Sequence, residues 1–373
     1  YRSLSLFEAI NGIPNSFVNS VNMKTSAGPP LNCSKANHVF PQTEESNCLS
    51  PEVRKLFDEA EDMLEHGEIP SWHSICTIKD EGVRKGKVSR IFNVLPVSSN
   101  LVMKIYGSPF KTFLRANFQH FESAVGINMT SQEANKVVFA LQRVDPSLTR
   151  LYDGDIKAMD KSWSGELFDY VALIVYALTF VTSGHIVARK AWLCCQSMKH
   201  VTYSIKGDVH RVFQNPSGND WTVELNGMLE SLAERYVYYR EHPYSGDVLA
   251  VENWFSTFFV LPYHDLGDLV FRDNVALVSY GDDNVKACRF PLTDNYAQIW
   301  KEELGIIVTP ADKTEKVFYM KSLDQITFLK RSFVWCEDAL LYLVPLDMKS
   351  LVRTLVIKKD SSLSDKDHAA TAR

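Results

Sequence analysis

The chain has 373 residues, of which 45% are hydrophobic and 23% are charged, and its formal net charge is −5 at pH 7. This length and apolar content suit a large packed core in two or three domains, and the total charge alone does not favour nucleic-acid binding. The seven cysteines have no repeated spacing, which argues against a disulfide framework or a zinc site and fits a reducing compartment.

Taken in chain order, the pattern predicts helices alternating with short strands. Residues 1–95 mix Pro, Gly and short apolar segments around one expected helix, Pro51–His66. Helical patterns over 96–185 frame a strand that ends near Asp155. A strand pair is expected over 201–212, a loop leading into a helix over 217–239 and a hairpin over 277–288. A helix over 295–305, strand-like alternation over 328–346 and a final helix from about 347 follow. Strands mixed with separate helices predict an α+β fold whose antiparallel sheet is covered on one face.

The segment Tyr170–Val181 is a largely apolar run. A helix needs about 20 apolar residues to cross a bilayer, so this run is too short and predicts a buried helix instead. No transmembrane segment is therefore expected. The final stretch, Lys358–Arg373, is polar, and we expect it to be loosely ordered.

Two adjacent carboxylates stand at a predicted hairpin turn. Residues 275–285 read VALVSYGDDNV, in which Gly281 permits a tight turn between two β-rich runs. Asp282 and Asp283 need their charge offset, and a divalent cation would do this because hard cations prefer carboxylate oxygens. Asp155, at the expected strand end, could reach the same ion. The alternatives are a plain surface turn for the hairpin and, for Asp160, the N-cap of the next helix.

A Gly-bearing loop and a basic run are further candidates. The loop that begins at Pro216 leads into a predicted helix, on which Thr222 and Asn226 are four residues apart and share one face. Ordinary polar helix residues would show the same spacing. Residues 79–90 carry a net positive charge, which suits a triphosphate but is also typical of a solvated loop.

In combination, these segments resemble motifs of the RNA-dependent RNA polymerases of picornaviruses and related picorna-like viruses. The matches follow the family's order between residues 25 and 331. They are the first palm motif (Asp155, Asp160), the second (Ser217, Gly218, Thr222, Asn226), YGDD (Tyr280–Asp283), TPADK (Thr309–Lys313), FLKR (Phe328–Arg331), a template-guiding fingers segment (Thr25–Pro29) and a basic fingers motif (Lys79–Arg90). Two departures are the short basic motif, which leaves the roles of Arg84 and Lys85 open, and the bulky Trp221, where the family has small residues.

The resemblance implies a right-hand polymerase. Fingers would occupy 1–95, a palm 96–327 with a small fingers insertion near 190–215, and the truncated start of a thumb 328–373, with an antiparallel palm sheet packed on helices. The implied reaction is template-directed RNA synthesis by two-metal nucleotidyl transfer, which replicates a positive-strand viral genome. We also expect this chain to be an internal piece of a longer enzyme, since too few residues follow Arg331 to build a whole thumb.

The resemblance also implies roles for individual residues. Asp155, Asp282 and Asp283 would be catalytic and would bind Mg²⁺, for which Mn²⁺ could substitute. Lys313 would be a further catalytic residue that protonates pyrophosphate, the alternative being a lysine on a solvated turn. The nucleotide-binding residues would be Lys79, Arg90, Asp160, Ser217, Thr222 and Asn226, and the RNA-binding residues Ser26, Gly28, Lys87, Lys330 and Arg331. Asp160 and Asn226 can exchange hydrogen bonds with the ribose 2′-hydroxyl.

The implied partners are an RNA template and primer, ribonucleoside triphosphates, a small viral protein that serves as primer, and other proteins of the replication complex. The expected location is the host cytoplasm, at membrane-associated viral replication complexes. The rival hypotheses are a reverse transcriptase and an inactive RNA-binding protein with the same palm. Asp160 together with Asn226 argues against the first, because a deoxynucleotide enzyme would usually place a bulky block near the ribose. The three intact aspartates argue against the second.

Overall fold

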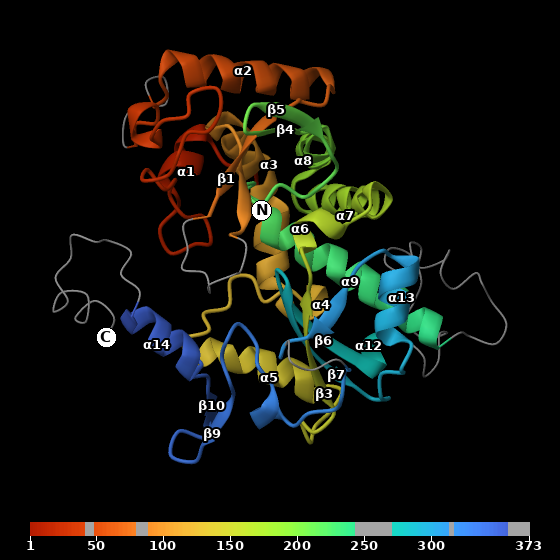
Figure 1. The fold of residues 1–373 in the computed structure, drawn as a ribbon. Coiled ribbons are helices and arrows are strands. Elements are labelled where there is room, and N and C mark those ends of the chain that lie inside the picture. The colour runs from red at the N-terminus through yellow and green to blue at the C-terminus, as the bar shows by residue number, and fades with distance from the viewer. Residues whose placement is uncertain (42–47, 80–88, 243–270, 313–316, 357–373) are drawn as a thin grey trace.

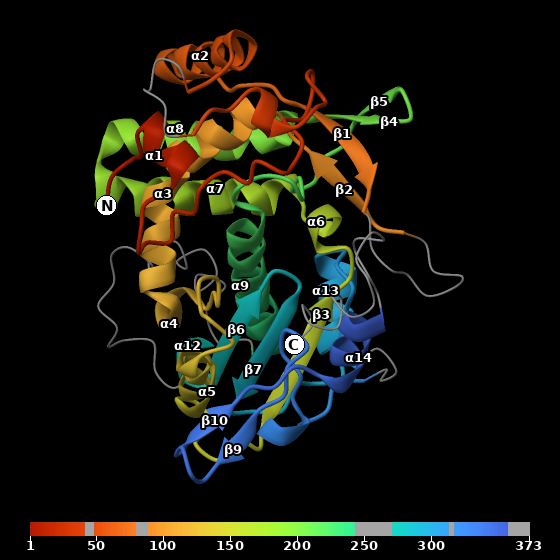
Figure 2. The same cartoon turned by 90° about the vertical axis from the view of Figure 1, so that its left-hand side faces the viewer.

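The computed structural model describes residues 1–41, 48–79, 89–242, 271–312 and 317–356, arranged as two parts, one above the other (Figures 1 and 2). The upper part contains α1 (Leu6–Asn11), α2 (Pro51–His66), α6 (Met159–Ser162), α7 (Gly165–Ser183), α8 (His185–Ser197), β1 (His73–Ile78), β2 (Ile91–Val94), β4 (Thr202–Ile205) and β5 (Asp208–Arg211). The lower part contains α4 (Phe118–Phe121), α5 (Asn135–Gln142), α12 (Phe271–Asn274), α13 (Tyr296–Glu303), α14 (Met348–Val356), β3 (Leu151–Ile156), β6 (Val275–Tyr280), β7 (Asp283–Cys288), β8 (Val308–Pro310), β9 (Val334–Cys336) and β10 (Leu341–Leu343). Helices α3 (Val97–Ala116) and α9 (Thr222–Glu241) run from one part to the other (Figure 2).

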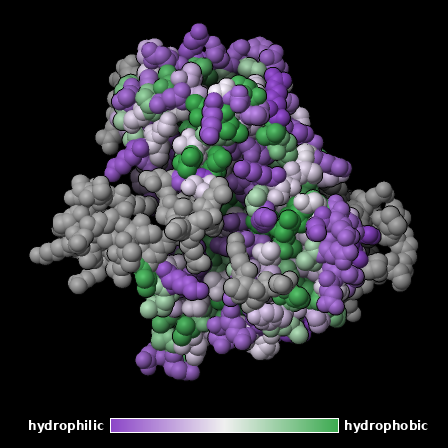
Figure 3. Space-filling model, viewed as in Figure 1, coloured by the Kyte–Doolittle hydropathy of each residue, from purple (hydrophilic) through white to green (hydrophobic). Residues whose placement is uncertain are grey.

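The bounds of α2 follow from its sequence, and the predicted helix Pro51–His66 is confirmed. Ser50 caps the N-terminus, Pro51 occupies the first turn, and Gly67 ends the helix in the left-handed conformation that glycine adopts without strain. The buried side chains repeat at helical spacing (Val53, Phe57, Ala60 and Leu64). The outer face of α2, at the top of Figure 3, is hydrophilic.

The upper sheet joins strands that are far apart in the sequence. Its order is β2-β1-β4-β5, with β1 and β4 parallel and the other pairs antiparallel. The strand pair predicted over 201–212 is therefore β4–β5, and it pairs with a strand from the first 95 residues. This places the 190–215 insertion beside the N-terminal elements, while the proposed domain boundaries stay predictions.

The lower sheet is antiparallel throughout, in the order β6-β7-β3-β8. Both of its faces are covered, so the expectation of one covered face is wrong. On β6, Ala276 and Val278 pack in a core with α5 residues, whereas Leu277 faces Tyr238 of α9 and Phe271 of α12. The reason is that every side chain of the run VALV is apolar, so successive residues bury opposite faces of the strand.

The segment after β3 differs from the N-cap alternative considered for Asp160. Asp160 lies inside the short helix α6, which follows Ala158 in a left-handed conformation (φ 52°). The long helix α7 begins later, and its cap is Ser164, whose hydroxyl oxygen accepts from the Leu167 N–H at 3.1 Å. Asp160 therefore does not cap the long helix.

Helix α7 is longer and more exposed than expected. It has 19 residues, and among the described residues it alone is long and apolar enough to cross a membrane by length and composition, a weak criterion that core helices of soluble proteins also meet. One face is buried (Phe168, Val171, Ala172 and Val175), but the opposite face leaves apolar side chains exposed (Tyr170, Leu173, Phe180 and Val181). The prediction of a buried helix is therefore correct for one face only.

Trp221, the bulky residue that departs from the family pattern, anchors α9 to α3. Its side chain is fully buried, its indole N–H donates to the Met103 carbonyl at 2.9 Å, and its ring meets Phe110 edge-on at 4.9 Å. The opposing residue on α3 is Gly107, where a Cβ would lie 2.1 Å from the indole nitrogen. A glycine on one helix thus makes the space that the tryptophan of the other helix fills.

A buried ion pair holds β3 to the segment that precedes β9. The Lys321 ammonium donates to Asp153 Oδ1 at 2.8 Å, and the Thr327 N–H donates to Asp153 Oδ2 at 3.0 Å. Both charged residues are about 95% buried or more. Removing one partner of such a pair leaves the other charge uncompensated in the interior.

Replacing Lys321 with Ala should therefore lower the free energy of unfolding by about 3–5 kcal/mol, the usual loss for a broken buried pair. Urea denaturation at neutral pH would measure it. The matched control is Lys136→Ala, which removes the exposed pair Lys136–Glu133 (3.0 Å) and should cost less than about 1 kcal/mol. Equal losses in the two variants would contradict the argument.

Candidate active site

Two of the three candidate metal-binding aspartates lie on neighbouring strands, Asp155 on β3 and Asp283 on β7, and the third, Asp282, lies in the turn before β7. Tyr280 pairs with Asp283 across the β6–β7 turn, whose tip is Gly281 (φ 64°) and the exposed Asp282. In the adjacent pair, Asp155 of β3 lies opposite Asp283, and the Ile156 N–H donates to the Asp282 carbonyl at 3.1 Å. The fold thus brings together carboxylates that are more than 120 positions apart in the sequence.

This donor set suits a hard divalent cation, because it consists of carboxylate oxygens from adjacent strand positions. Within the described ranges, however, no three acidic, His or Cys groups converge closely enough to form a ready-made cage. An ion would have to draw the Asp155, Asp282 and Asp283 side chains together. Their mutual repulsion without an ion favours that uptake.

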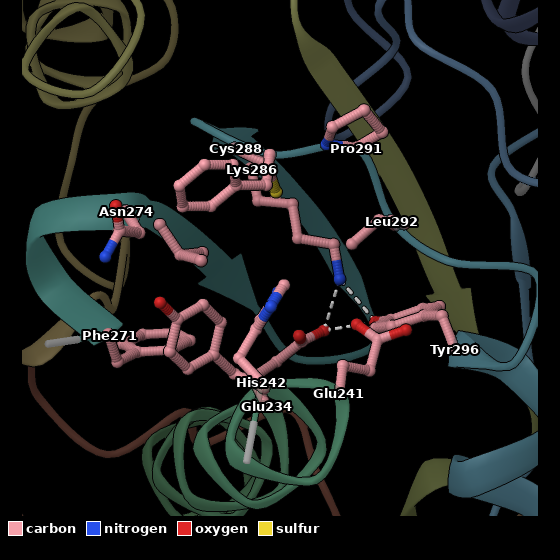
Figure 4. A pocket seen from close by; sticks show the side chains of 13 residues that line it. Glu234, Glu241, His242, Phe271, Asn274, Lys286, Cys288, Pro291, Leu292 and Tyr296 are labelled. Carbon is pink, nitrogen blue, oxygen red and sulfur yellow. Dashed lines mark hydrogen bonds and ion pairs between the residues drawn. The ribbon is translucent and has the colours of Figure 1, made fainter. Parts of the chain in front are cut away.

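Strand β7 is anchored from its buried side. The Lys286 ammonium donates to Glu234 of α9 at 2.6 Å and to the Tyr296 hydroxyl of α13, and that hydroxyl also donates to Glu234 at 2.5 Å (Figure 4). Lys286 is 1% exposed. Because Lys286 follows Asp283 by three residues on β7, this network fixes the strand that begins at Asp283.

Asp160 and Asn226 are in contact, and both were predicted from the sequence to bind the ribose 2′-hydroxyl. Asn226 donates from Nδ2 to Asp160 Oδ1 at 2.8 Å, and Asn226 Oδ1 accepts from Asn215 Nδ2 at 2.8 Å and from the Trp163 indole at 3.2 Å. Burial raises the pKa of Asp160; the bond from Asn226 opposes the shift, and the negative charge of Asp282 adds to it. The amide of Asn226 is therefore fixed in one orientation, with its nitrogen toward Asp160 and close to the turn that carries Asp282.

The loop before α9 is held by its own polar side chains. Asn219 donates to Asn215 Oδ1 at 2.7 Å, and Thr222 donates through its hydroxyl to the Pro216 carbonyl at 2.9 Å. The Thr222 hydroxyl proton is thus used inside the loop, which makes Thr222 a support for the site in this structure. Its predicted contact with the nucleotide stays a prediction.

Ser217 and Gly218 attach this loop to the upper sheet. Ser217 Oγ accepts from the Asn93 N–H of β2 at 3.1 Å, and a Cβ at Gly218 would lie 1.9 Å from the Asn93 carbonyl oxygen. Three residues that support this site, namely Asn93, Asn215 and Trp163, were not predicted from the sequence. Asn215 directly precedes the Gly-bearing loop and could have been included, whereas nothing in the sequence singles out Asn93 or Trp163.

The structure places the remaining predicted residues on other elements. Lys79 and Arg90 meet where β1 ends and β2 begins, and the Lys79 N–H donates to the Arg90 carbonyl at 2.8 Å. Lys330 and Arg331 lie beside the β9–β10 pair, where Arg331 donates to the Val344 carbonyl at 2.8 Å. Lys87 and Lys313 lie outside the described residues, as do Arg84, Lys85 and the polar tail from Lys358.

Ser26 and Gly28 belong to a loop that docks on the start of α3. The Gly28 N–H donates to Ser26 Oγ at 3.0 Å, and a Cβ at Gly28 (φ 74°) would lie 2.2 Å from the Leu95 carbonyl oxygen. Nearby is a cavity of about 430 Å³ that extends to Gly218 and Tyr280. Basic side chains line it (Lys35, Lys104, Lys111 and Arg115), together with Asp220 and Glu224. Lys111 is paired with Asp220 at 2.7 Å and Arg115 with Glu224 at 2.8 Å, so the excess positive charge comes from Lys35 and Lys104.

Comparison with known proteins points to one family. Residues 11–365 match the family model described as viral RNA-dependent RNA polymerase. The replicase polyprotein of Drosophila C virus (strain EB) is 24% identical over 379 residues, which is 95% of this chain and 20% of the polyprotein. The RNA1 polyprotein of Arabis mosaic virus (isolate NW) is 26% identical over 315 residues, which is 79% of this chain and 12% of the polyprotein. The chain thus spans only a minor part of these relatives.

A solved structure supports the fold. The Sicinivirus 3Dpol RNA-dependent RNA polymerase superimposes with a TM-score of 0.73 at 19% identity, over 98% of this chain and 71% of that protein. At this identity the match concerns the fold alone. The α+β, right-hand polymerase architecture expected from the sequence is confirmed.

Gly218→Ala should displace the loop from β2, because its Cβ would meet a backbone oxygen that cannot move aside. We expect a loss of about 1–3 kcal/mol in the free energy of unfolding, the usual cost of overpacking. The control is Gly165→Ala, whose Cβ would meet nothing nearer than 3.9 Å, and which should be neutral or slightly stabilising. Thermal unfolding followed by circular dichroism would measure both. If Gly218→Ala were as stable as the control, the close approach to Asn93 would be wrong.

Proposed function

The chain belongs to the family of viral RNA-dependent RNA polymerases, and on that premise we propose that it synthesises RNA from ribonucleoside triphosphates on an RNA template. The observation that carries the proposal is the placement of Asp155 opposite Asp283, beside the Asp160–Asn226 pair. The carboxylates of Asp155 and Asp283 suit metal-bound phosphates, and the Asp160–Asn226 pair suits a ribose hydroxyl. In its biological setting the reaction would replicate a positive-strand viral genome.

We propose that Asp155, Asp282 and Asp283 hold two Mg²⁺ ions, for which Mn²⁺ can substitute. When bound, such ions activate the attacking 3′-hydroxyl and stabilise the leaving pyrophosphate. The contribution of the chain itself is positioning, which dominates phosphoryl transfer because little covalent chemistry is left to the protein. The anchored strand β7 supplies it, since Lys286 and Tyr296 restrict the movement of the carboxylates.

Selection of ribose is assigned to Asp160 and Asn226. Asn226 Nδ2 occupies Asp160 Oδ1, so the second carboxylate oxygen of Asp160 remains to accept a bond from a 2′-hydroxyl. A site built to bind a hydroxyl penalises a substrate that lacks it, because its buried polar groups are then left unpaired. Asn215 and Trp163 hold the Asn226 amide in the orientation that this selection needs.

The RNA strand is assigned to the Ser26–Gly28 loop and to the basic cavity lined by Lys35, Lys104 and Tyr280. Lys35 and Lys104 offer charge for phosphates, whose neutralisation supplies most sequence-independent affinity. We further propose that the enzyme uses a small viral protein as primer and works with other replication proteins at membrane-associated complexes in the host cytoplasm. Fractionation of infected cells, with the polymerase traced by antibody, would test this location; recovery solely in the soluble fraction would contradict it.

Asp282→Ala should abolish nucleotide addition, with a loss of about 10²–10³-fold or more, the scale on which charge stabilisation at a reacting centre contributes. Asp282 is exposed at the turn, so the fold should be preserved. Mg²⁺-dependent extension of a labelled RNA primer is the assay. Asp294→Ala, at another exposed turn, is the matched control and should retain activity. Near wild-type extension by a folded Asp282→Ala protein would refute the proposed role.

Asn226→Ala should reduce discrimination between ribonucleotides and deoxyribonucleotides by about 10-fold or more. The lost bond is to a charged acceptor, and such bonds contribute about 1.5–3 kcal/mol. The quantity to measure is the ratio of kcat/KM for the two sugars. Gln298→Ala, on the exposed face of α13, is the control and should keep the wild-type ratio. An unchanged ratio in Asn226→Ala would show that ribose is selected elsewhere.

A further inference from the structure

A thiol–imidazole pair lies in the N-terminal region, away from the catalytic strands. Cys33 Sγ and His38 Nε2 are 3.0 Å apart, and the other ring nitrogen of His38, Nδ1, is 2.9 Å from Ser50 Oγ. The Glu52 carboxylate lies 4.0 Å from the same Nδ1. A nucleophile in contact with a base, and the base oriented by a third group, is the arrangement that activates cysteine in many enzymes.

The backbone fixes these groups in place. A short 3₁₀ helix, Lys35–Asn37, turns the chain between Cys33 and His38, and the His38 N–H donates to the Lys35 carbonyl at 2.9 Å. The Ser50 N–H then donates to the His38 carbonyl at 2.8 Å, and Ser50 is itself the N-cap of the 16-residue helix α2. The His38 side chain is 16% exposed. The imidazole is therefore held through its backbone and both ring nitrogens.

Cys33 differs from the other cysteines in its surroundings. Four of them are buried (Cys48, Cys194, Cys195 and Cys288). Burial raises the pKa of Cys194, Cys195 and Cys288, and also that of the partly buried Cys76, which keeps these thiols protonated and inert. Cys33 and Cys336 are both partly exposed. They differ in that the thiol of Cys33 contacts the imidazole of His38.

We propose that Cys33 is a covalent modification site, a nucleophilic thiol that reacts with soft electrophiles such as the disulfide of oxidised glutathione. His38 Nε2 accepts the thiol proton, and the Glu52 carboxylate stabilises the imidazolium that results. The thiolate attacks one sulfur of the glutathione disulfide, a protein–glutathione disulfide forms, and the second glutathione leaves as a thiolate that takes up the proton. Cys33 is oxidised and one glutathione is released in reduced form.

The position of Cys33 couples this chemistry to RNA, a step that rests on the proposed function. The Ala27 N–H donates to the Cys33 carbonyl at 2.7 Å, and Ser26 forms a β-bridge with Ser34. Lys35 donates to Thr25 Oγ1 at 2.9 Å and also lines the basic cavity. A glutathione adduct, which is bulky and carries net negative charge, would thus sit beside the loop assigned to RNA. Modification should weaken RNA binding.

The first experiment needs no RNA. Native protein is treated with limiting iodoacetamide at neutral pH, and the labelling rate of each cysteine is read from its peptide by mass spectrometry. Cys33 should react about 10-fold faster than Cys336 or more, because the thiolate is the reactive species. Equal rates in the wild-type protein would overturn the proposal without any variant.

Two variants assign the activation to the pair. His38→Gln should slow labelling of Cys33 to the rate of Cys336 and leave Cys336 unchanged. Fast labelling of the buried Cys194 would reveal unfolding of that variant. If His38→Gln does not fold, Glu52→Gln replaces it as the test, because Glu52 has an exposed side chain. This variant should slow the labelling of Cys33 by a smaller factor and leave the labelling of the other cysteines unchanged. Unchanged Cys33 rates in a folded His38→Gln protein would show that the imidazole has no role.

The second experiment separates this inference from the proposed function. Protein is treated with oxidised glutathione, and its affinity for a labelled template–primer RNA is measured by fluorescence anisotropy before and after reduction with dithiothreitol. We expect about a 10-fold loss that reduction restores, and no loss in Cys33→Ser. Adduct formation with unchanged affinity would overturn the coupling to RNA. Absence of RNA binding in untreated protein would count against the proposed function, while the labelling result would still decide the thiol site.

Discussion

The antiparallel pairing of β3 with β7 is the constraint on which the candidate active site depends. Successive side chains of a strand point to opposite faces, so a slip of one residue would turn Asp155 and Asp283 to different sides of the sheet. In the observed register they are opposite each other, with Asp282 at the adjoining turn. Because close carboxylates repel one another, contacts elsewhere in the sheet must hold this register.

Those contacts are buried charges on both faces of the sheet: Lys286 lies on the face opposite Asp283, and Asp153 lies on the same face as Asp155. Lys286 fixes β7 to Glu234 of α9. Lys321 binds Asp153 and thereby fixes β3 to the segment that precedes β9. Such pairs add little net stability, because desolvation offsets their attraction, but a slipped register would leave each charge unpaired at high cost. Burial raises the pKa of the fully buried Glu230 well above its usual value, and nearby Glu234 adds to the shift. This direction favours the protonated form, which avoids a further negative charge in this interior.

The sequence predicted those features whose cause is local. The capped helix α2, the hairpin around Gly281 and the helix bearing Asn226 follow from caps, turn chemistry and periodicity, and their positions are confirmed. What it did not predict depends on contacts between distant segments. Nothing near Gly107 indicates that Trp221 fills the space above it. The apolar run of α7 likewise does not reveal that one of its faces is exposed. Covering of the palm sheet on both faces likewise depends on where α5 packs.

The polar groups around Asp160 and Asn226 show how the two parts of the molecule are connected. Asn226 belongs to the helix that descends to the lower sheet, whereas the loop leading into that helix is attached to Asn93 of the upper sheet through Ser217. The backbone approaches Asn93 of β2 closely at Gly218. The loop and β2 are therefore expected to move together. Any displacement of the upper sheet would therefore reach Asn215 and, through its side chain, the amide that orients Asp160. A rigid loop between the two sheets makes the geometry of the Asp160–Asn226 pair depend on how the upper sheet sits on the lower part of the molecule.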